Sequence, residues 1–527
     1  MIVRQVLSDI ISLSCIHEMH IIKYKISTGK GGYIMLKDHV KAEIPEKEEL
    51  KVKLKAEREK LAASLMSIKD AKLPVMVICE GFGGAGVGST LGKVVNCIDP
   101  RFFKLKSFGG KASEDEKRYP FLYRYMLTIP EAGKFTFYDG FWMHEITDAL
   151  LDGSLSEKLY EKRVSSIQSA ERALHDNGYI ILKFFFRIGK KEQKKRFEKL
   201  LDNKDTKWRV DDGDLRENKE YEDHERVYDR YLNDTDSAIA PWYIVDSEDE
   251  RFSEWQLLSV INRGIDTALK NKALAAPVRQ NRFKLVPMQK LSEVSFEGKE
   301  LTDEEYEEEL KDLQKRLRAL HYRLYRKKIP VVIAYEGWDA AGKGGNIKRI
   351  TKALDPRGYE VHPVASPEPH EKARFFLWRF WNRLPKTGHI AIFDRTWYGR
   401  VMVERLEGFC SENDWQRAYN EMNEFEKELS DWGAVVIKFW VDIDKDTQLA
   451  RFTDRQNTPE KQWKITDEDW RNREKWDLYE AAVDEMLEKT STEFAPWYIL
   501  ESVDKKYARI KALRIVIKRL EEACGKD

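Results

Sequence analysis

Apolar residues along this chain follow two patterns, short unbroken runs and longer stretches with one apolar residue every three or four positions. In the second half the unbroken runs are 331–335, 389–393, 434–441 and 497–500. Such runs are typical of strands that are buried on both faces of a parallel sheet. Helical stretches separate the runs, and the leucines of 302–328 form one apolar stripe at helical spacing. The alternation predicts an α/β fold with helices flanking a mostly parallel sheet.

The layout occurs twice. Ala240-Pro241-Trp242-Tyr243-Ile244 recurs as Ala495-Pro496-Trp497-Tyr498-Ile499, at an offset of 255 residues. Asp99-Pro100-Arg101 recurs as Asp355-Pro356-Arg357, at an offset of 256. A nearly constant offset over several landmarks indicates one domain that was copied with its length preserved.

We therefore expect two tandem domains, at 36–265 and 290–527, joined by a linker at 266–289. The 527 residues are too many for one hydrophobic core, which agrees with this division. Residues 1–34 contain a broken apolar stretch and no clear cleavage site, and we expect them to form a disordered extension.

Composition excludes several classes of protein. Lys and Arg number 92 against 91 Asp and Glu, so a globally basic nucleic-acid coat is not expected. The five cysteines form no CxxC pair, which favours a reducing, cytoplasmic setting over a disulfide scaffold. No apolar run reaches the roughly 20 residues that span a bilayer, so no membrane partner is expected.

A glycine-rich loop directly follows the first buried run of the second half. Gly337-x4-Gly342-Lys343 precedes an amphipathic helix, the arrangement of a phosphate-binding P-loop. The Ser or Thr that normally follows the lysine and binds Mg²⁺ is replaced by Gly344, and the loop carries a carboxylate, Asp339. Both departures are explained if Asp339 itself helps to hold a divalent ion.

Asp394 ends the next buried run, where a second Mg²⁺ ligand is expected in a P-loop domain. Arg395 and Arg400 are placed to neutralise phosphate oxygens. Glu404 lies four residues after Arg400, which leaves an ion pair and a ligand role equally open. Between 337 and 400 there are 12 Lys and Arg against 6 Asp and Glu, a local surplus that favours a polyanion site.

Farther along, Arg451 and Arg455 lie one helical turn apart and Lys464 follows them. These residues are candidates for a basic helical lid that closes over phosphates, and a solvated charged helix is the equally open alternative.

The first half lacks most of these groups. At the repeat offsets, Lys343 corresponds to Val87, Asp339 to Gly83, Arg395 to Gly140, Arg400 to Glu145 and Arg455 to Leu200, whereas Asp394 is matched by Asp139. Without the lysine and most arginines the first half should not stabilise a transferred phosphate. We therefore assign catalysis to the second half and regard the first as a degenerate copy.

The motifs of the second half resemble the polyphosphate kinase type 2 family. The resemblance rests on 337–350, 354–358, Asp394-Arg395-Thr396-Trp397-Tyr398 and the lid segment 452–464, and it covers nearly all of 302–505 and, more weakly, 45–250. It implies P-loop-kinase-like domains and, because the chain is duplicated, transfer of phosphate from inorganic polyphosphate to AMP, giving ADP. It also implies that Asp339, Lys343, Asp394 and Arg395 are catalytic, with Mg²⁺, or alternatively Mn²⁺, held by the two aspartates. The predicted phosphate- and nucleotide-binding residues are Gly337, Gly342, Gly344, Gly345, Lys348, Arg349, Arg400, Glu404, Arg451, Arg455 and Lys464.

Three alternatives stay open from the sequence. The same loop would serve an ATP-dependent kinase of a small molecule, and the acceptor in a polyphosphate reaction could be a nucleoside diphosphate. A non-catalytic polyanion-binding protein is the third. Four aromatic residues could stack on a base, although a core position is the more ordinary expectation for them: Trp338, Trp397, Tyr398 and Phe409. A homo-oligomer is also left open.

Overall fold

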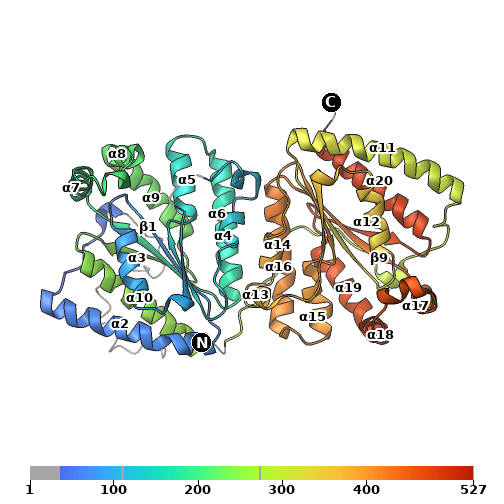
Figure 1. The fold of residues 1–527 in the computed structure, drawn as a ribbon, viewed down its shortest axis with the longest axis horizontal. Coiled ribbons are helices and arrows are strands. Elements are labelled where there is room, and N and C mark those ends of the chain that lie inside the picture. Colours follow the sequence, from blue (N-terminus) through green and yellow to red (C-terminus); the bar gives the residue numbers. More distant parts are fainter. Residues whose placement is uncertain (1–35, 109–111, 272–273, 526–527) are drawn as a thin grey trace, which may run out of the picture. The chain divides into compact units, whose positions relative to one another are not determined.

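The computed structural model describes residues 36–108, 112–271 and 274–525, so the predicted extension 1–34 lies outside the described residues. The chain divides into two compact units (Figure 1). The first comprises Met1–Ala112 and Thr128–Leu274, and the second comprises Ser113–Leu127 and Ala275–Asp527.

The first unit is built on a five-stranded parallel sheet with the strand order β2-β3-β1-β4-β5. Its strands are β1 Val75–Gly81, β2 Phe103–Ser107, β3 Phe135–Asp139, β4 Ile180–Arg187 and β5 Trp242–Asp246. Its helices are α2 Lys47–Asp70, α3 Val87–Val95, α5 Trp142–Leu151, α6 Glu157–Asp176, α7 Lys190–Leu201, α8 Asp212–Lys219, α9 Tyr221–Thr235 and α10 Glu250–Asn271.

The second unit repeats this sheet, with the order β10-β9-β6-β8-β7 and parallel pairing throughout the named strands. Its strands are β6 Val331–Gly337, β7 Tyr359–Pro363, β8 Ile390–Asp394, β9 Val435–Asp442 and β10 Trp497–Glu501. Its helices are α4 Tyr123–Met126, α11 Asp303–Lys327, α12 Lys343–Thr351, α13 Pro369–Lys372, α14 Trp378–Trp381, α15 Val403–Leu406, α16 Glu412–Asp431, α17 Lys445–Asn457, α18 Asp467–Glu474, α19 Trp476–Thr490 and α20 Lys505–Cys524.

In each unit helices lie on both faces of the sheet (Figure 1). The central strands are accordingly buried along their length, as in β9, where all eight residues are buried. The predicted α/β fold with two tandem copies is confirmed. Helix α11 also begins where the sequence indicates, because Thr302 caps it by accepting a hydrogen bond from the Glu305 N–H.

The strand order determines where the site residues lie. Strand β6 is central, with β8 on one side and β9 on the other. Because the three strands are parallel, their carboxyl ends meet at one edge of the sheet, and Tyr335 of β6 lies in register with Asp394 of β8. The loops after β6 and β8 therefore emerge side by side, the arrangement in which α/β sheets bind ligands.

Candidate active site

The loop after β6 has a backbone that only glycine allows at its two ends. Gly337 has φ +149°, and a Cβ there would lie 2.4 Å from the Val441 carbonyl oxygen. Gly342 has φ +114° and caps the start of α12. A Cβ at Gly344 would meet nothing within 4 Å, so the first turn of the helix has open space beside it. The loop is thus a strand–turn–helix cradle whose N–H groups suit an anion.

Lys343 lies within the curve of this loop. Its Nζ donates to the carbonyl oxygens of Gly337 at 2.6 Å and Trp338 at 3.1 Å. The ammonium group is therefore held at the loop and not directed into bulk solvent.

Asp339 is placed between cationic and amide donors. One carboxylate oxygen lies 3.3 Å from the Arg395 guanidinium, and the other accepts a hydrogen bond of 3.0 Å from Asn472 Nδ2 on α18. Burial alone would raise the pKa of Asp339, but the charges of Lys343 and Arg395 outweigh it and lower the pKa. Asp339, Lys343 and Arg395 are thus brought together as predicted, and Asp339 is ionised at neutral pH.

The loop after β8 forms the other side of the candidate site. Asp394 ends the strand, half-buried, and among the described residues no hydrogen bond or ion pair joins its carboxylate to another side chain. Arg395 follows with φ +66°, an uncommon conformation for a residue with a side chain, and its N–H donates to the Tyr335 carbonyl at 3.0 Å. Buried Glu336 fixes this loop by accepting hydrogen bonds of 2.7 Å from both the N–H and the hydroxyl of Thr396.

Other predicted ligands lie outside this cluster. Arg400 forms an ion pair of 2.7 Å with Glu404, so the structure contains the ion pair that the spacing left open. Lys348 is exposed on α12, and the Arg349 guanidinium donates to Tyr306 Oη at 3.3 Å and to the Gly345 carbonyl at 3.4 Å.

Arg451 contacts backbone carbonyls of the phosphate loop. Its guanidinium donates to the loop carbonyls of Ala340 and Ala341, both at 3.0 Å, and to those of Ser502 and Val503 at 2.6 and 3.0 Å. With these four carbonyl contacts, Arg451 ties the loop to the end of β10. It therefore holds the loop in place, and its contact with phosphate stays a prediction.

The predicted lid segment, 452–464, corresponds to the end of α17 and the 3-10 segment Pro459–Lys464, and α18 follows it. Gln448 Nε2 on α17 donates to the Asp339 carbonyl at 3.2 Å, and Arg473 on α18 donates to Gln448 Oε1 at 3.2 Å. The side chain of Lys464 lies outside the described part of the structure. No motif indicated Gln448, Asn472 or Glu336. Gln448 and Asn472 reach Asp339 only when α17 and α18 pack against the loop, and Glu336 reaches Thr396 only when β6 and β8 pair.

Three of the four candidate base-stacking residues belong to the core. Trp397 and Tyr398 are fully buried over Glu426, which accepts from both and pairs with Lys438 at 2.8 Å. Trp338 is buried and stacked on Trp476. Phe409, at 73% exposed, is the one on the surface.

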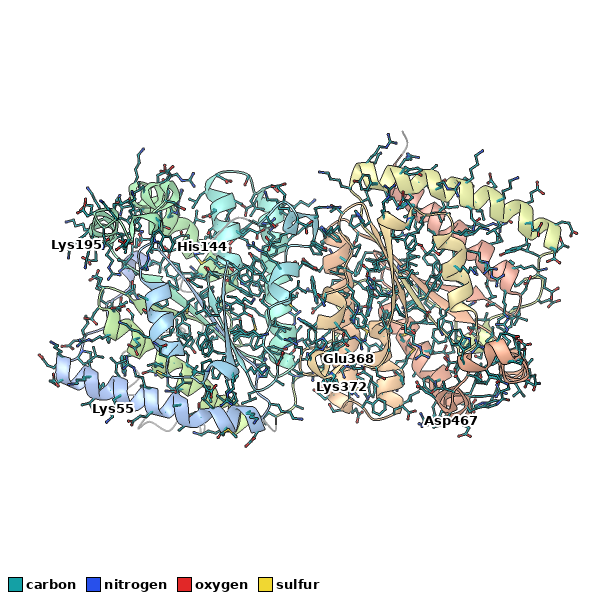
Figure 2. All side chains as sticks on the ribbon, viewed as in Figure 1. Lys55, His144, Lys195, Glu368, Lys372 and Asp467 are labelled. Carbon is teal, nitrogen blue, oxygen red and sulfur yellow. The ribbon has the colours of Figure 1, made fainter. Side chains whose placement is uncertain are left out.

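In the first unit the loop after β1 corresponds to the phosphate loop, and carboxylates of the same unit lie beside it. The Gly83 N–H, at the position of Asp339, donates to Glu217 Oε1 at 2.8 Å, and Glu217 is buried on α8 at the position of Asn472. His144, labelled in Figure 2, lies 3.1 Å from Glu80 Oε2. A carboxylate of the first unit therefore accepts the hydrogen bond of a loop N–H that could otherwise face an anion. The lysine and the arginine of the second unit have no counterpart in the first unit.

No helix among the described residues combines the length and apolarity that crossing a membrane requires. In the same part of the chain, no three or more His, Cys, Asp or Glu side chains are grouped so that protein ligands alone could hold a metal ion.

Comparison with known proteins agrees with this geometry. The sequence matches the family Polyphosphate kinase 2 (PPK2) over residues 45–273 and again over 300–527. It is 38% identical to the Polyphosphate:AMP phosphotransferase of Pseudomonas aeruginosa, over 89% of this chain and 95% of that protein. It is 38% identical to the protein of the same name from Acinetobacter johnsonii, over 87% and 94% of the two chains. A crystal structure of a polyphosphate kinase 2 from Pseudomonas aeruginosa PA01 superposes with a TM-score of 0.77 and 37% identity, over 91% of this chain and 97% of that one. The resemblance seen in the motifs is confirmed, and the chain belongs to the polyphosphate kinase 2 family.

Proposed function

We propose that the second unit transfers the terminal phosphate of inorganic polyphosphate to AMP, giving ADP. The observation that carries the proposal is the cluster of Lys343, Asp339 and Arg395 at the phosphate loop, next to Asp394. The first unit lacks the lysine and the arginine of this cluster. The name carried by relatives that are 38% identical over nearly their whole length supports the same donor and acceptor.

The proposed reaction needs no general base, because the phosphate of AMP is already ionised at neutral pH. One of its oxygens forms a bond to the terminal phosphorus of polyphosphate. The bond to the bridging oxygen breaks, and the chain leaves one unit shorter with the electron pair. Loop amides and Lys343 hold the phosphates in place, and Arg395 neutralises charge on the transferred group.

The carboxylates of the cluster fit a magnesium ion. Mg²⁺ in kinase sites takes one or two carboxylates, and substrate phosphates and water complete its shell. Asp339 and Asp394 supply that number, and the lowered pKa of Asp339 keeps it in the ligating form. We propose that these two residues hold Mg²⁺, with Mn²⁺ as the alternative ion. The ion, when bound, would neutralise phosphate charge.

A cytoplasmic setting is part of the proposal. Cys79, Cys97 and Cys410 are free thiols, as expected of a protein kept in reducing conditions.

The test is an acceptor screen with polyphosphate and Mg²⁺ in the absence of any nucleoside triphosphate, with products separated by chromatography. We expect ADP from AMP. No product from polyphosphate, together with phosphorylation in a parallel assay in which ATP replaces polyphosphate, would replace the proposal with an ATP-dependent kinase. A strong preference for ADP or GDP as acceptor would reassign the substrate.

A further inference from the structure

A buried carboxylate lies behind the phosphate loop and binds one of its side chains. Asp442, the last residue of β9, is only 3% exposed. Its Oδ1 accepts a hydrogen bond of 2.9 Å from the Trp338 indole N–H and one of 3.1 Å from the Trp440 indole N–H. Trp338 is the loop residue between Gly337 and Asp339. The first of these bonds therefore joins the phosphate loop to β9.

The backbone of Trp338 is connected to the charged groups of the candidate site. Its carbonyl oxygen accepts a hydrogen bond of 3.1 Å from Lys343 Nζ, and Asp339 is the next residue in the chain. If the indole turned away from Asp442, this carbonyl and the following carboxylate would move with it. A displacement of about 1 Å at a reacting group can cost on the order of 10²-fold in rate. The indole bond therefore restrains the geometry on which phosphate transfer would depend.

The ring face of Trp338 contacts the helices that follow the lid segment. Trp338 stacks on Trp476, with ring centroids 3.7 Å apart and an angle of 10° between the planes. Trp476 is the first residue of α19, which comes just after α18, the helix that carries Asn472 (Figure 1). Tyr479 of α19 donates to Asn472 Oδ1 at 3.1 Å, and Asn472 Nδ2 donates to Asp339. The ring stack thus holds the loop and α18 in the positions at which these two bonds form.

The first unit has the same ring stack without the hydrogen bond. Phe82 stands at the position of Trp338, and Tyr221 stands at that of Trp476. Their rings are stacked with centroids 4.6 Å apart and an angle of 7° between the planes. A phenylalanine ring has no N–H group, so Phe82 cannot donate to a carboxylate. The ring stack is therefore common to both units, whereas the indole bond belongs to the unit whose loop carries Lys343.

The buried carboxylate also differs between the units. At the position of Asp442 the first unit has Arg187, which lies 4.0 Å from Glu225. Burial of a carboxylate is costly, and it raises the pKa of Asp442 to about 7 although two indole N–H groups stabilise the charged form. Because the first unit forms the same sheet without this carboxylate, the fold does not require it. A costly buried group beside a functional loop is expected to serve that loop.

We propose that Asp442 is a positioning residue for phosphate transfer, which acts through the Trp338 indole to fix the loop carbonyl that holds Lys343. The same restraint places Asp339, and the ring stack on Trp476 extends it to α18. The proposal rests on the proposed function, because it takes phosphate transfer at this loop as the reaction.

The first experiment gives the loop the residue of the first unit, in Trp338→Phe of the full chain. The ring stack is retained and the N–H that binds Asp442 is lost, so we expect kcat to fall about 10-fold and the KM for AMP to change little. Trp440→Phe is the matched control, because it removes the other indole N–H from the same carboxylate oxygen, at a residue of β9 outside the loop. The control should lower the melting temperature by a similar amount and leave kcat almost unchanged.

A second pair of variants tests Asp442 itself. Asp442→Asn keeps an oxygen that can accept from the Trp338 indole, and it should retain most of the wild-type kcat. Asp442→Leu leaves that indole without its acceptor, and kcat should fall about 10-fold or more. Near-ultraviolet circular dichroism reports on the stacked tryptophans. Its signal should change in Asp442→Leu and be kept in Asp442→Asn.

Equal kcat values in Trp338→Phe and Trp440→Phe would overturn the proposal, because Asp442 would then only stabilise the fold. A loss in Asp442→Asn as large as that in Asp442→Leu would also overturn it. If Asp442→Leu does not fold, as judged by thermal unfolding, Trp338→Phe and its control decide the question. Absence of ADP formation from polyphosphate by the wild type contradicts the proposed function instead. The variants are then compared with ATP as the donor, because the restraint on the loop does not depend on the donor.

Discussion

The two units share their buried framework and differ at the surface of one loop. Lys438 pairs with Glu426 at 2.8 Å beneath the second site, and Lys183 pairs with Glu171 at 2.9 Å in the same place of the first unit. A buried pair of this kind stays costly to break, because either partner alone would be an uncompensated charge. The first unit therefore has the buried ion pair that supports the sheet, but it lacks the lysine and the arginine that would bind phosphate.

The backbone at two loop positions sharpens this contrast. In the first unit Gly84 and Gly140 have φ +70° and +73°, values that cost glycine nothing. The matching residues of the second unit, Ala340 and Arg395, adopt φ +62° and +66° although they carry side chains. Such conformations cost of order 1 kcal/mol or more and tend to lie at functional sites. In the second unit, the backbone at Arg395 is therefore strained where its guanidinium lies beside Asp339.

The largest expected difference between the units concerns their matching aspartates. Asp394→Asn should lower phosphate transfer at least about 10²-fold, because it removes one of the two carboxylates that we propose to hold the metal ion. Asp139→Asn, the same change at the matching position of the first unit, should leave transfer within about 2-fold. Initial rates of ADP formation measure both. Equal losses in the two variants would mean that the first unit takes part in the chemistry.

Lys343→Val gives the second unit the residue that the first has at Val87. We expect a loss of about 10²-fold in kcat/KM with the fold intact, because the ammonium at the loop is lost. The reverse change, Val87→Lys, should create no activity, since Glu217 still occupies the Gly83 amide. Circular dichroism checks folding of each variant. Transfer by a Val87→Lys chain that also carries Lys343→Val would contradict this account.

Arg395→Gly separates chemistry from strain. Transfer should fall at least about 10-fold because a neutralising guanidinium is lost. The free energy of unfolding should change by less than about 1 kcal/mol, because relief of the left-handed backbone offsets the loss of a half-exposed ion pair.

The control for that variant is Lys328→Gly at the end of α11, a left-handed residue remote from the loop, with φ +54°. It should leave transfer unchanged and should not destabilise the protein. Thermal or urea unfolding gives both free energies. A drop of several kcal/mol in Arg395→Gly would show that the arginine mainly holds the fold.

The sequence predicted the parts of the site that directly follow a strand end. The glycine loop, Lys343 and the Asp394-Arg395 pair follow directly from strand ends, and parallel pairing brings those ends together. Asn472 was missed because its bond to Asp339 depends on how α18 folds back over the loop. The carbonyl contacts of Arg451 were missed because a basic residue on a helix does not reveal whether its guanidinium faces a substrate or backbone carbonyls.

The smallest expected effect is a pH dependence that belongs to the second unit alone. With the pKa of Lys505 at about 8, the side chain is mostly charged at pH 7 and mostly neutral at pH 9. Because a polyanion is attracted to the charged form of Lys505 and not to the neutral one, we expect the KM for long-chain polyphosphate to rise between pH 7 and pH 9. The rise should be at most about 10-fold for each unit by which bound phosphate raises the pKa of Lys505. The charged groups that face Lys505 are Arg451, Arg455, Arg509 and Asp454. Lys505→Arg should flatten the rise, since guanidinium does not titrate there. A rise of the same size in Lys505→Arg would assign the titration to a group other than Lys505.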